Sequence, residues 1–154
     1  MNRTAAEIMT ATPLIVLSPH DRLPKIASLL MDNHVSAAPV VDAGGHLLGL
    51  VSERDLIRHL GQEQEQRRAW WLEQLSEGEP LASDFLEYLN AENRTAADIM
   101  KHDVVTVTET TLVGDIVDLF AKHGIKRVPV LRDGKLVGIV ARSDIIRAMA
   151  GGKR

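Results

Sequence analysis

The chain has 154 residues, of which 45% are hydrophobic and 25% charged, values that fit one globular domain or two small lobes. It contains no cysteine, which excludes disulfides, thiolate metal sites and cysteine nucleophiles. The net charge of −3 is unlike the basic field of a nucleic-acid binder, and no apolar run approaches the roughly 18 residues of a membrane span. We therefore expect a soluble, cytoplasmic protein without nucleic-acid or membrane partners.

The first half of the chain opens with a predicted helix, strand and second helix. Thr4 and Glu7 have the spacing of a capping box, which predicts a short helix after residue 4. Residues 14–17 are rich in branched side chains and predict a strand. An amphipathic helix follows, because apolar residues recur at helical spacing, namely Leu23, Ile26, Leu29 and Leu30.

A hairpin and a last helix complete this first set of elements. A second strand is predicted to begin at Val40, and glycines at 44–45 mark the turn. The third strand covers 46–51, and the final helix starts near Glu53. The predicted order is helix, strand, helix, strand, strand, helix.

An acidic segment, residues 59–94, follows and carries 3 basic against 8 acidic residues. Its periodicity predicts two helices broken near Gly78 and Pro80. Trp70 and Trp71 are adjacent, so one narrow helical stripe cannot bury both equally. The pair either packs this segment onto its own body or forms a partner or dimer surface, and the sequence leaves both open.

The second half of the chain repeats the first. "NRTAAEIM" at 2–9 returns as "NRTAADIM" at 93–100, and "GLVSERDLIR" at 49–58 returns as "GIVARSDIIR" at 138–147. An internal duplication of this kind predicts two copies of one structural unit. We expect repeat 1 at 1–58, a helical insert at 59–94, repeat 2 at 95–150 and a disordered tail at 151–154.

The elements of repeat 2 follow the same order. Thr95 and Asp98 resemble the first capping box, and a strand is predicted at 104–107. The next strands begin at Val130 and cover 135–140, with the last helix starting near Arg142. The apolar positions of the middle helix are Val113, Ile116, Val117 and Phe120.

These duplicated motifs resemble the cystathionine β-synthase (CBS) domain, a regulatory module that occurs as tandem pairs (Bateman modules). The carriers are "EIMTATPLIVLSP", "DIMKHDVVTVTE", the two "PV" strand starts and the two "G-h-V-x-x-x-D" exits. The whole chain is similar to small stand-alone bacterial CBS-pair proteins. The resemblance implies an α/β fold of two βαββα-type units with pseudo-twofold symmetry and packed sheets, a homodimer, and adenosine-containing ligands bound in clefts between the units.

Asp55 and Asp144 occupy the same position in the two repeats and have two interpretations. Asp55 could answer Ser52 in a capping box, a purely structural role. Repeat 2 has Ala141 instead of that serine yet retains Asp144, although Ser143 could cap alone. A carboxylate can also accept hydrogen bonds from both hydroxyls of a ribose, which favours ligand contact.

The resemblance implies two clefts, each combining the aspartate of one repeat with loop residues of the other. Cleft 1 would be lined by Asp144, Ser143, Thr10, Pro13, Ile15, Val35, Ser36 and Ala37. Cleft 2 would be lined by Asp55, Ser52, Lys101, Val105, Ile125, Lys126 and Arg127. Ala141 and Arg54 replace hydroxyl residues common in the family, so each cleft lacks one expected hydroxyl.

Lys126 and Arg127 distinguish the two clefts, because Ser36 and Ala37 stand at the matching positions. A guanidinium binds phosphate oxygens in a bidentate fork, and the ammonium adds a second positive charge. Cleft 2 is therefore expected to prefer phosphorylated nucleotides. Alternatively, both side chains only form a solvated strand edge.

No catalytic or metal-binding motif is present: the six histidines lack HxxxH or HExxH spacing, and there is no P-loop or nucleophile elbow. We expect a non-catalytic sensor of AMP, ADP or ATP, ahead of NAD or S-adenosylmethionine, that signals to a regulated protein of unknown identity. The alternatives are a dimerisation scaffold with vestigial clefts and an enzyme of unrecognised type.

Overall fold

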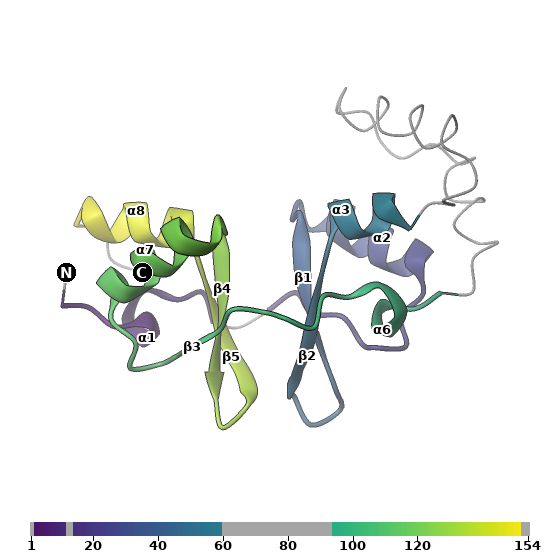
Figure 1. Cartoon of the computed structure of the whole chain (residues 1–154), viewed down its shortest axis with the longest axis horizontal. Coiled ribbons are helices and arrows are strands. Elements are labelled where there is room, and N and C mark those ends of the chain that lie inside the picture. The colour runs from purple at the N-terminus through teal and green to yellow at the C-terminus, as the bar shows by residue number, and fades with distance from the viewer. Residues whose placement is uncertain (1, 12–13, 60–93, 152–154) are drawn as a thin grey trace. The chain divides into compact units, whose positions relative to one another are not determined.

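The computed structural model describes residues 2–11, 14–59 and 94–151, which form two compact units (Figure 1). Unit 1 comprises the described residues of Met1–Leu14, Val41–Leu47 and Asp103–Arg154. Unit 2 comprises those of Ile15–Val40 and Leu48–His102. The predicted insert helices, Trp70, Trp71 and most of the predicted tail lie outside the described residues.

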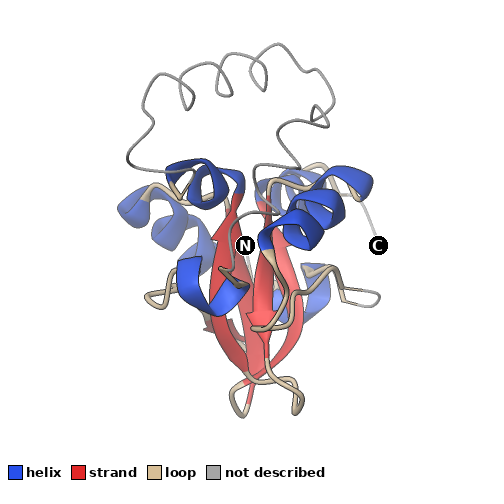
Figure 2. Cartoon of the chain, turned by 90° about the vertical axis from the view of Figure 1, so that its right-hand side faces the viewer, coloured by secondary structure: helices blue, strands red, loops and turns tan. Residues whose placement is uncertain are grey.

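Unit 1 contains a three-stranded sheet in the order β3-β4-β5. β3 is parallel to β4, with Val107 opposite Val130, whereas β4 and β5 are antiparallel, with Pro129 opposite Ile139. Helices lie beside the strands (Figure 2). The elements are α1 (Ala5–Ile8), β3 (Val107–Thr108), α7 (Val113–His123), β4 (Arg127–Arg132), β5 (Lys135–Ala141) and α8 (Arg142–Met149).

Unit 2 is built around the paired strands β1 and β2, whose ends Val41 and Leu47 are grouped with unit 1. Its elements are α2 (Leu23–Asp32), β1 (Ala37–Val41), β2 (Leu47–Ser52), α3 (Glu53–Arg58) and α6 (Ala96–Ile99). The element order predicted for each repeat is therefore confirmed, apart from the first strands.

The first strand of each repeat is shorter than predicted. Only β3 forms in repeat 2, and repeat 1 has a single bridge between Leu17 and Val40. The amide of Leu17 donates to the carbonyl of Pro39 at 2.8 Å, so the backbone edge of Pro39 faces residue 17. The next ladder bond would need an N–H on Pro39, which proline lacks, so pairing cannot extend to Ile15.

The same geometry explains why β1 and β4 begin three residues earlier than predicted, at Ala37 and Arg127. The edge of Pro39 that lacks an N–H points away from β2. The proline therefore removes no hydrogen bond from the β1–β2 pair, and strand β1 continues through it.

Each unit has its own apolar core, centred on the predicted amphipathic helix. In unit 2, Leu23, Ile26 and Leu30 of α2 are buried against the strands. In unit 1, Val113 and Ile116 of α7 are fully buried. Val117 of α7 and Leu29 of α2 were also predicted to face the core, but Val117 is 41% exposed and Leu29 is only partly buried, because each lies at the edge of its stripe.

The compact units do not coincide with the sequence repeats. Helix α1 comes from repeat 1, yet it contacts β3, β5 and α8, and its Ala5 and Ile8 are buried in the core of unit 1. Helix α6 comes from repeat 2, yet Ala96 and Ile99 belong to the core of unit 2. Each unit therefore takes its short opening helix from the other repeat.

The residues that follow these opening helices add a further bridge to each hairpin. Thr10 exchanges backbone hydrogen bonds of 2.8 and 2.9 Å with Ile139 of β5, and Lys101 exchanges bonds of 2.9 and 3.0 Å with Leu50 of β2. Glycine is required where each of these segments passes over its strand. A Cβ on Gly138 would clash with Met9, and a Cβ on Gly49 would clash with Met100. This docking brings Thr10 and Lys101 beside strands that lead directly into α8 and α3.

Candidate functional site

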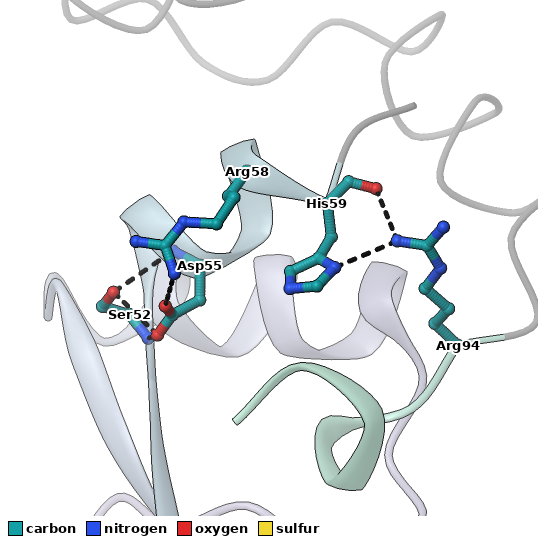
Figure 3. Close-up of polar contacts among 5 residues, drawn as sticks. All are labelled: Ser52, Asp55, Arg58, His59 and Arg94. Carbon is teal, nitrogen blue, oxygen red and sulfur yellow. Dashed lines mark hydrogen bonds and ion pairs between the residues drawn. The ribbon is translucent and has the colours of Figure 1, made fainter. Parts of the chain in front are cut away.

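Asp55 lies in the first turn of α3, where strand β2 ends at Ser52 (Figure 3). The Ser52 amide and hydroxyl donate to Asp55 Oδ2 at 2.9 and 3.0 Å, and the Asp55 amide donates to the Ser52 hydroxyl at 3.2 Å. This is a reciprocal capping box, which satisfies orphan donors at a helix start. The capping interpretation is thus correct for one oxygen of the carboxylate.

The other oxygen of Asp55 is in a different situation. Asp55 is 1% exposed, and its Oδ1 has no hydrogen-bond partner anywhere in the part of the chain that the structure describes. The nearest cation is Arg58, whose Nη1 lies 3.6 Å away as an ion pair (Figure 3). Leaving a buried acceptor without a hydrogen bond costs about 1–3 kcal/mol, so Oδ1 would gain from an added donor.

Asp144 occupies the equivalent place at the start of α8 in unit 1. Its Oδ2 accepts the amide of Ala141 at 2.8 Å, but Ala141 has no hydroxyl, so only this half of the box forms. Its Oδ1 accepts from the Thr10 hydroxyl at 3.4 Å and from Arg147 Nη1 at 3.2 Å. Asp144 is 4% exposed, so it is buried like Asp55. Each of the two buried carboxylates therefore has an arginine close to its Oδ1 atom.

The residues ahead of β1 and β4 lie at the starts of these same helices. The amide of Glu53 donates to the Ser36 carbonyl at 2.9 Å, and the amide of Arg142 donates to the Lys126 carbonyl at 3.1 Å. Ser36 therefore lies in unit 2 at the end that carries Asp55, and Lys126 lies in unit 1 at the end that carries Asp144.

The structure distributes the predicted site residues over both units, and Pro13 lies outside the described residues. Unit 1 holds Thr10, Val105, Ile125, Lys126, Arg127, Ser143 and Asp144. Unit 2 holds Ile15, Val35, Ser36, Ala37, Ser52, Asp55 and Lys101. Thr10 and Asp144 are in contact within unit 1. Each predicted cleft takes residues from both units, so the two clefts remain predictions.

Four of the predicted lining residues have a structural role inside their own unit. Ile15 and Val35 pack against the core of unit 2, and Val105 and Ile125 pack against that of unit 1. Two residues that matter at the carboxylates, Arg58 and Arg147, were not singled out from the sequence. Their signal was an arginine three positions after each aspartate, in both repeats.

Arg94 joins the two chain ends that flank residues 60–93. Its Nη1 lies 3.0 Å from His59 Nδ1 and donates to the His59 carbonyl at 3.2 Å (Figure 3). Since a guanidinium can only donate, Nδ1 acts as the acceptor and a neutral His59 carries its proton on Nε2. This contact satisfies a carbonyl at the C-terminal end of α3.

Metal binding and membrane insertion find no support among the described residues. No group of three or more His, Cys, Asp or Glu side chains there could hold a metal ion. No helix within the same ranges has the length and apolar character needed to cross a bilayer.

Comparison with known families identifies the two repeats. The family model described as the CBS domain matches residues 5–62 and 96–151, which together make up more than half of the chain. The chain belongs to the CBS domain family. The predicted resemblance and the predicted α/β fold of two CBS repeats are confirmed.

Similar proteins extend over nearly the whole CBS pair. MJ1426, an uncharacterised protein of Methanocaldococcus jannaschii, is 32% identical and covers 89% of this chain and 86% of its own length. A CBS domain of a membrane protein from Sphaerobacter thermophilus is 33% identical, with a TM-score of 0.69 over 95% of this chain and 87% of that one. CBSX2 of Arabidopsis thaliana, solved in complex with AMP, is 25% identical, with a TM-score of 0.72 over 97% of each chain.

Proposed function

We propose that this CBS pair is a non-catalytic regulatory module that binds adenosine-containing ligands, foremost AMP, ADP or ATP, through Asp55 and Asp144. One observation carries the proposal. Each buried carboxylate uses Oδ2 to cap its helix and directs Oδ1 elsewhere, and Oδ1 of Asp55 has no hydrogen bond among the described residues. A ribose hydroxyl is a donor of the kind that Oδ1 lacks.

The wider ligand sites form part of the same proposal. The AMP complex of CBSX2, a protein 25% identical to this chain, supports the ligand class. The first proposed set is Asp144, Ser143, Thr10, Pro13, Ile15, Val35, Ser36 and Ala37. The second is Asp55, Ser52, Lys101, Val105, Ile125, Lys126 and Arg127, in which the two cations would neutralise phosphate.

Regulation would follow from differential affinity. A ligand that binds one arrangement of the chain better than another shifts the population toward it, and a regulated partner would read that shift. The proposal includes a homodimer, for which Ile146 and Met149 of α8, 62% and 67% exposed, are suitable apolar side chains.

A scaffold without ligand is the second candidate. It is favoured by Asp144, whose Oδ1 already accepts from Thr10 and Arg147, as expected of a carboxylate with a structural role. It is opposed by Oδ1 of Asp55, which forms an ion pair with Arg58 but has no hydrogen bond among the described residues.

A thermal-shift screen separates the two candidates. AMP, ADP, ATP, NAD and S-adenosylmethionine are each added to the full chain, with GMP as a control for the base. A ligand present at 100 times its Kd stabilises the fold by about 2.7 kcal/mol, which raises the melting temperature measurably. We expect a shift with an adenine nucleotide; the absence of a shift with every adenosine compound would leave the scaffold.

A further inference from the structure

The two carboxylates differ in how completely their Oδ1 atoms are satisfied. Asp144 Oδ1 has two hydrogen-bond donors, the Thr10 hydroxyl at 3.4 Å and Arg147 Nη1 at 3.2 Å. Asp55 Oδ1 is the buried side-chain oxygen or nitrogen that lacks any hydrogen-bond partner among the described residues. A ligand hydroxyl would add a bond at Asp55 but would have to replace one at Asp144.

Two sequence differences between the repeats, at matching positions, produce this difference in hydrogen bonding. Thr10 of unit 1 corresponds to Lys101 of unit 2, and each is held by backbone bonds beside the strand that leads to its aspartate. Thr10 has a short hydroxyl that reaches Asp144, whereas the exposed Lys101 makes no hydrogen bond to Asp55. In addition, Ser52 fixes Asp55 Oδ2 with its hydroxyl, which Ala141 cannot do for Asp144.

Arg58 is the group that a ligand must displace at Asp55. Its side chain is 48% exposed and reaches back over the carboxylate, which is itself 2% exposed (Figure 3). At 3.6 Å it forms an ion pair without a hydrogen bond. Because about half of its side chain is exposed, Arg58 can turn into water and be replaced by a ligand donor at the buried carboxylate.

We infer that the two aspartates are unequal ligand acceptors: Asp55 is the tighter site, and the Thr10 hydroxyl acts as a built-in competitor that weakens the site at Asp144. This inference rests on the proposed function, since it concerns the same carboxylates. Thr10 then sets the affinity of its site by occupying the oxygen that a ribose hydroxyl needs. Occupancy of the chain by an adenine nucleotide would be ordered, with Asp55 filled first.

Calorimetric titration of the full chain with AMP tests the order. We expect the wild type to show two affinities about tenfold or more apart, consistent with the cost of displacing one hydrogen bond. Asp55→Asn should remove the tighter step, and Asp144→Asn the weaker one. Asp98→Asn is the matched control. Asp98 accepts bonds of 2.8 and 3.1 Å from the amide and hydroxyl of Thr95, as Asp55 does from Ser52, at the start of a helix without a proposed ligand.

Thr10→Val, made in the Asp55→Asn background, tests the competitor. Valine keeps the shape of threonine and removes the hydroxyl, so the remaining affinity for AMP should rise about three- to tenfold. A fall in affinity would mean that the Thr10 hydroxyl, as a member of the first proposed set, helps the ligand more than it competes for Asp144, and it would overturn the inference. Equal affinities at the two sites, or a tighter site at Asp144, would overturn it while leaving the proposed function intact. No AMP binding by the wild type would remove both.

Discussion

Gly49 faces the carbonyl oxygen of Lys101 so closely that a Cβ atom at residue 49 would lie 2.6 Å from that oxygen. Gly49→Ala should therefore push the 100–101 segment away from β2 and lower the free energy of unfolding by about 1–3 kcal/mol, measured by urea denaturation. Gly114→Ala is the matched control, because nothing lies within 4 Å of its added Cβ. Gly114 is the second residue of α7, so this control should raise stability by at most about 0.5–1 kcal/mol, the gain expected in the middle of a helix. Equal effects of the two variants would contradict the close approach.

The hydroxyl of Ser52 is expected to stabilise α3, and the same hydroxyl is missing at Ala141. Ser52→Ala removes the acceptor of the Asp55 amide and should lower the free energy of unfolding by about 1 kcal/mol. Ala141→Ser supplies that acceptor at α8 and should raise stability by a similar amount. Denaturation curves of the two variants test whether the free energy of unfolding falls in Ser52→Ala and rises in Ala141→Ser. Loss of stability in Ala141→Ser would mean that its site cannot hold a hydroxyl.

Arg127 is predicted to contribute to phosphate binding, and Arg132, an arginine outside both proposed sets, is its control. Arg132 forms a bidentate pair with Glu109, with bonds of 2.6 and 2.7 Å. Arg127→Ala should lower the affinity for AMP about tenfold or more, because a hydrogen bond to a charged group is lost. Arg132→Ala should leave that affinity unchanged in the same calorimetric titration. Equal effects would remove the phosphate assignment from Arg127.

The Glu109–Arg132 pair also predicts a pH dependence. Hydrogen bonds from Arg132 hold the pKa of Glu109 below its ordinary value. Since the pKa is lower in the folded state, the pair stabilises the fold above the unfolded-state pKa of about 4.3, and this contribution is lost as the pH falls through the folded-state pKa. Arg132→Ala should return the Glu109 pKa toward its ordinary value in an NMR titration. A Glu109 pKa that does not respond to this variant would contradict the pairing.

Much of the fold could be predicted from local patterns. Helical spacing located α2 and α7, and repeated glycine and branched residues located β2 and β5, because these signals depend on near neighbours in the sequence. The first strands were predicted, but not how short they are, because their length depends on which way the edge of Pro39 faces. The exchange of α1 and α6 between the repeats is a long-range packing effect that no local pattern contains.

The site was predictable in part for the same reason. The repeat pointed to Asp55 and Asp144, and Ser52 pointed to a capping box at one of them. That one carboxylate oxygen caps while the other remains for another donor depends on side-chain geometry, which sequence spacing does not specify. The bond from Thr10 to Asp144 depends on the docking of Thr10 against Ile139, residues far apart in the chain.

The most direct measurement compares AMP with its 2′,3′-dideoxy analogue in calorimetric titrations of the full chain. If the carboxylates accept the ribose hydroxyls, the wild type should bind AMP about tenfold or more tightly than the analogue, because hydrogen bonds to a charged group are lost. That preference should disappear in the Asp55→Asn, Asp144→Asn double variant. Equal affinity of the wild type for AMP and the dideoxy analogue would contradict the account.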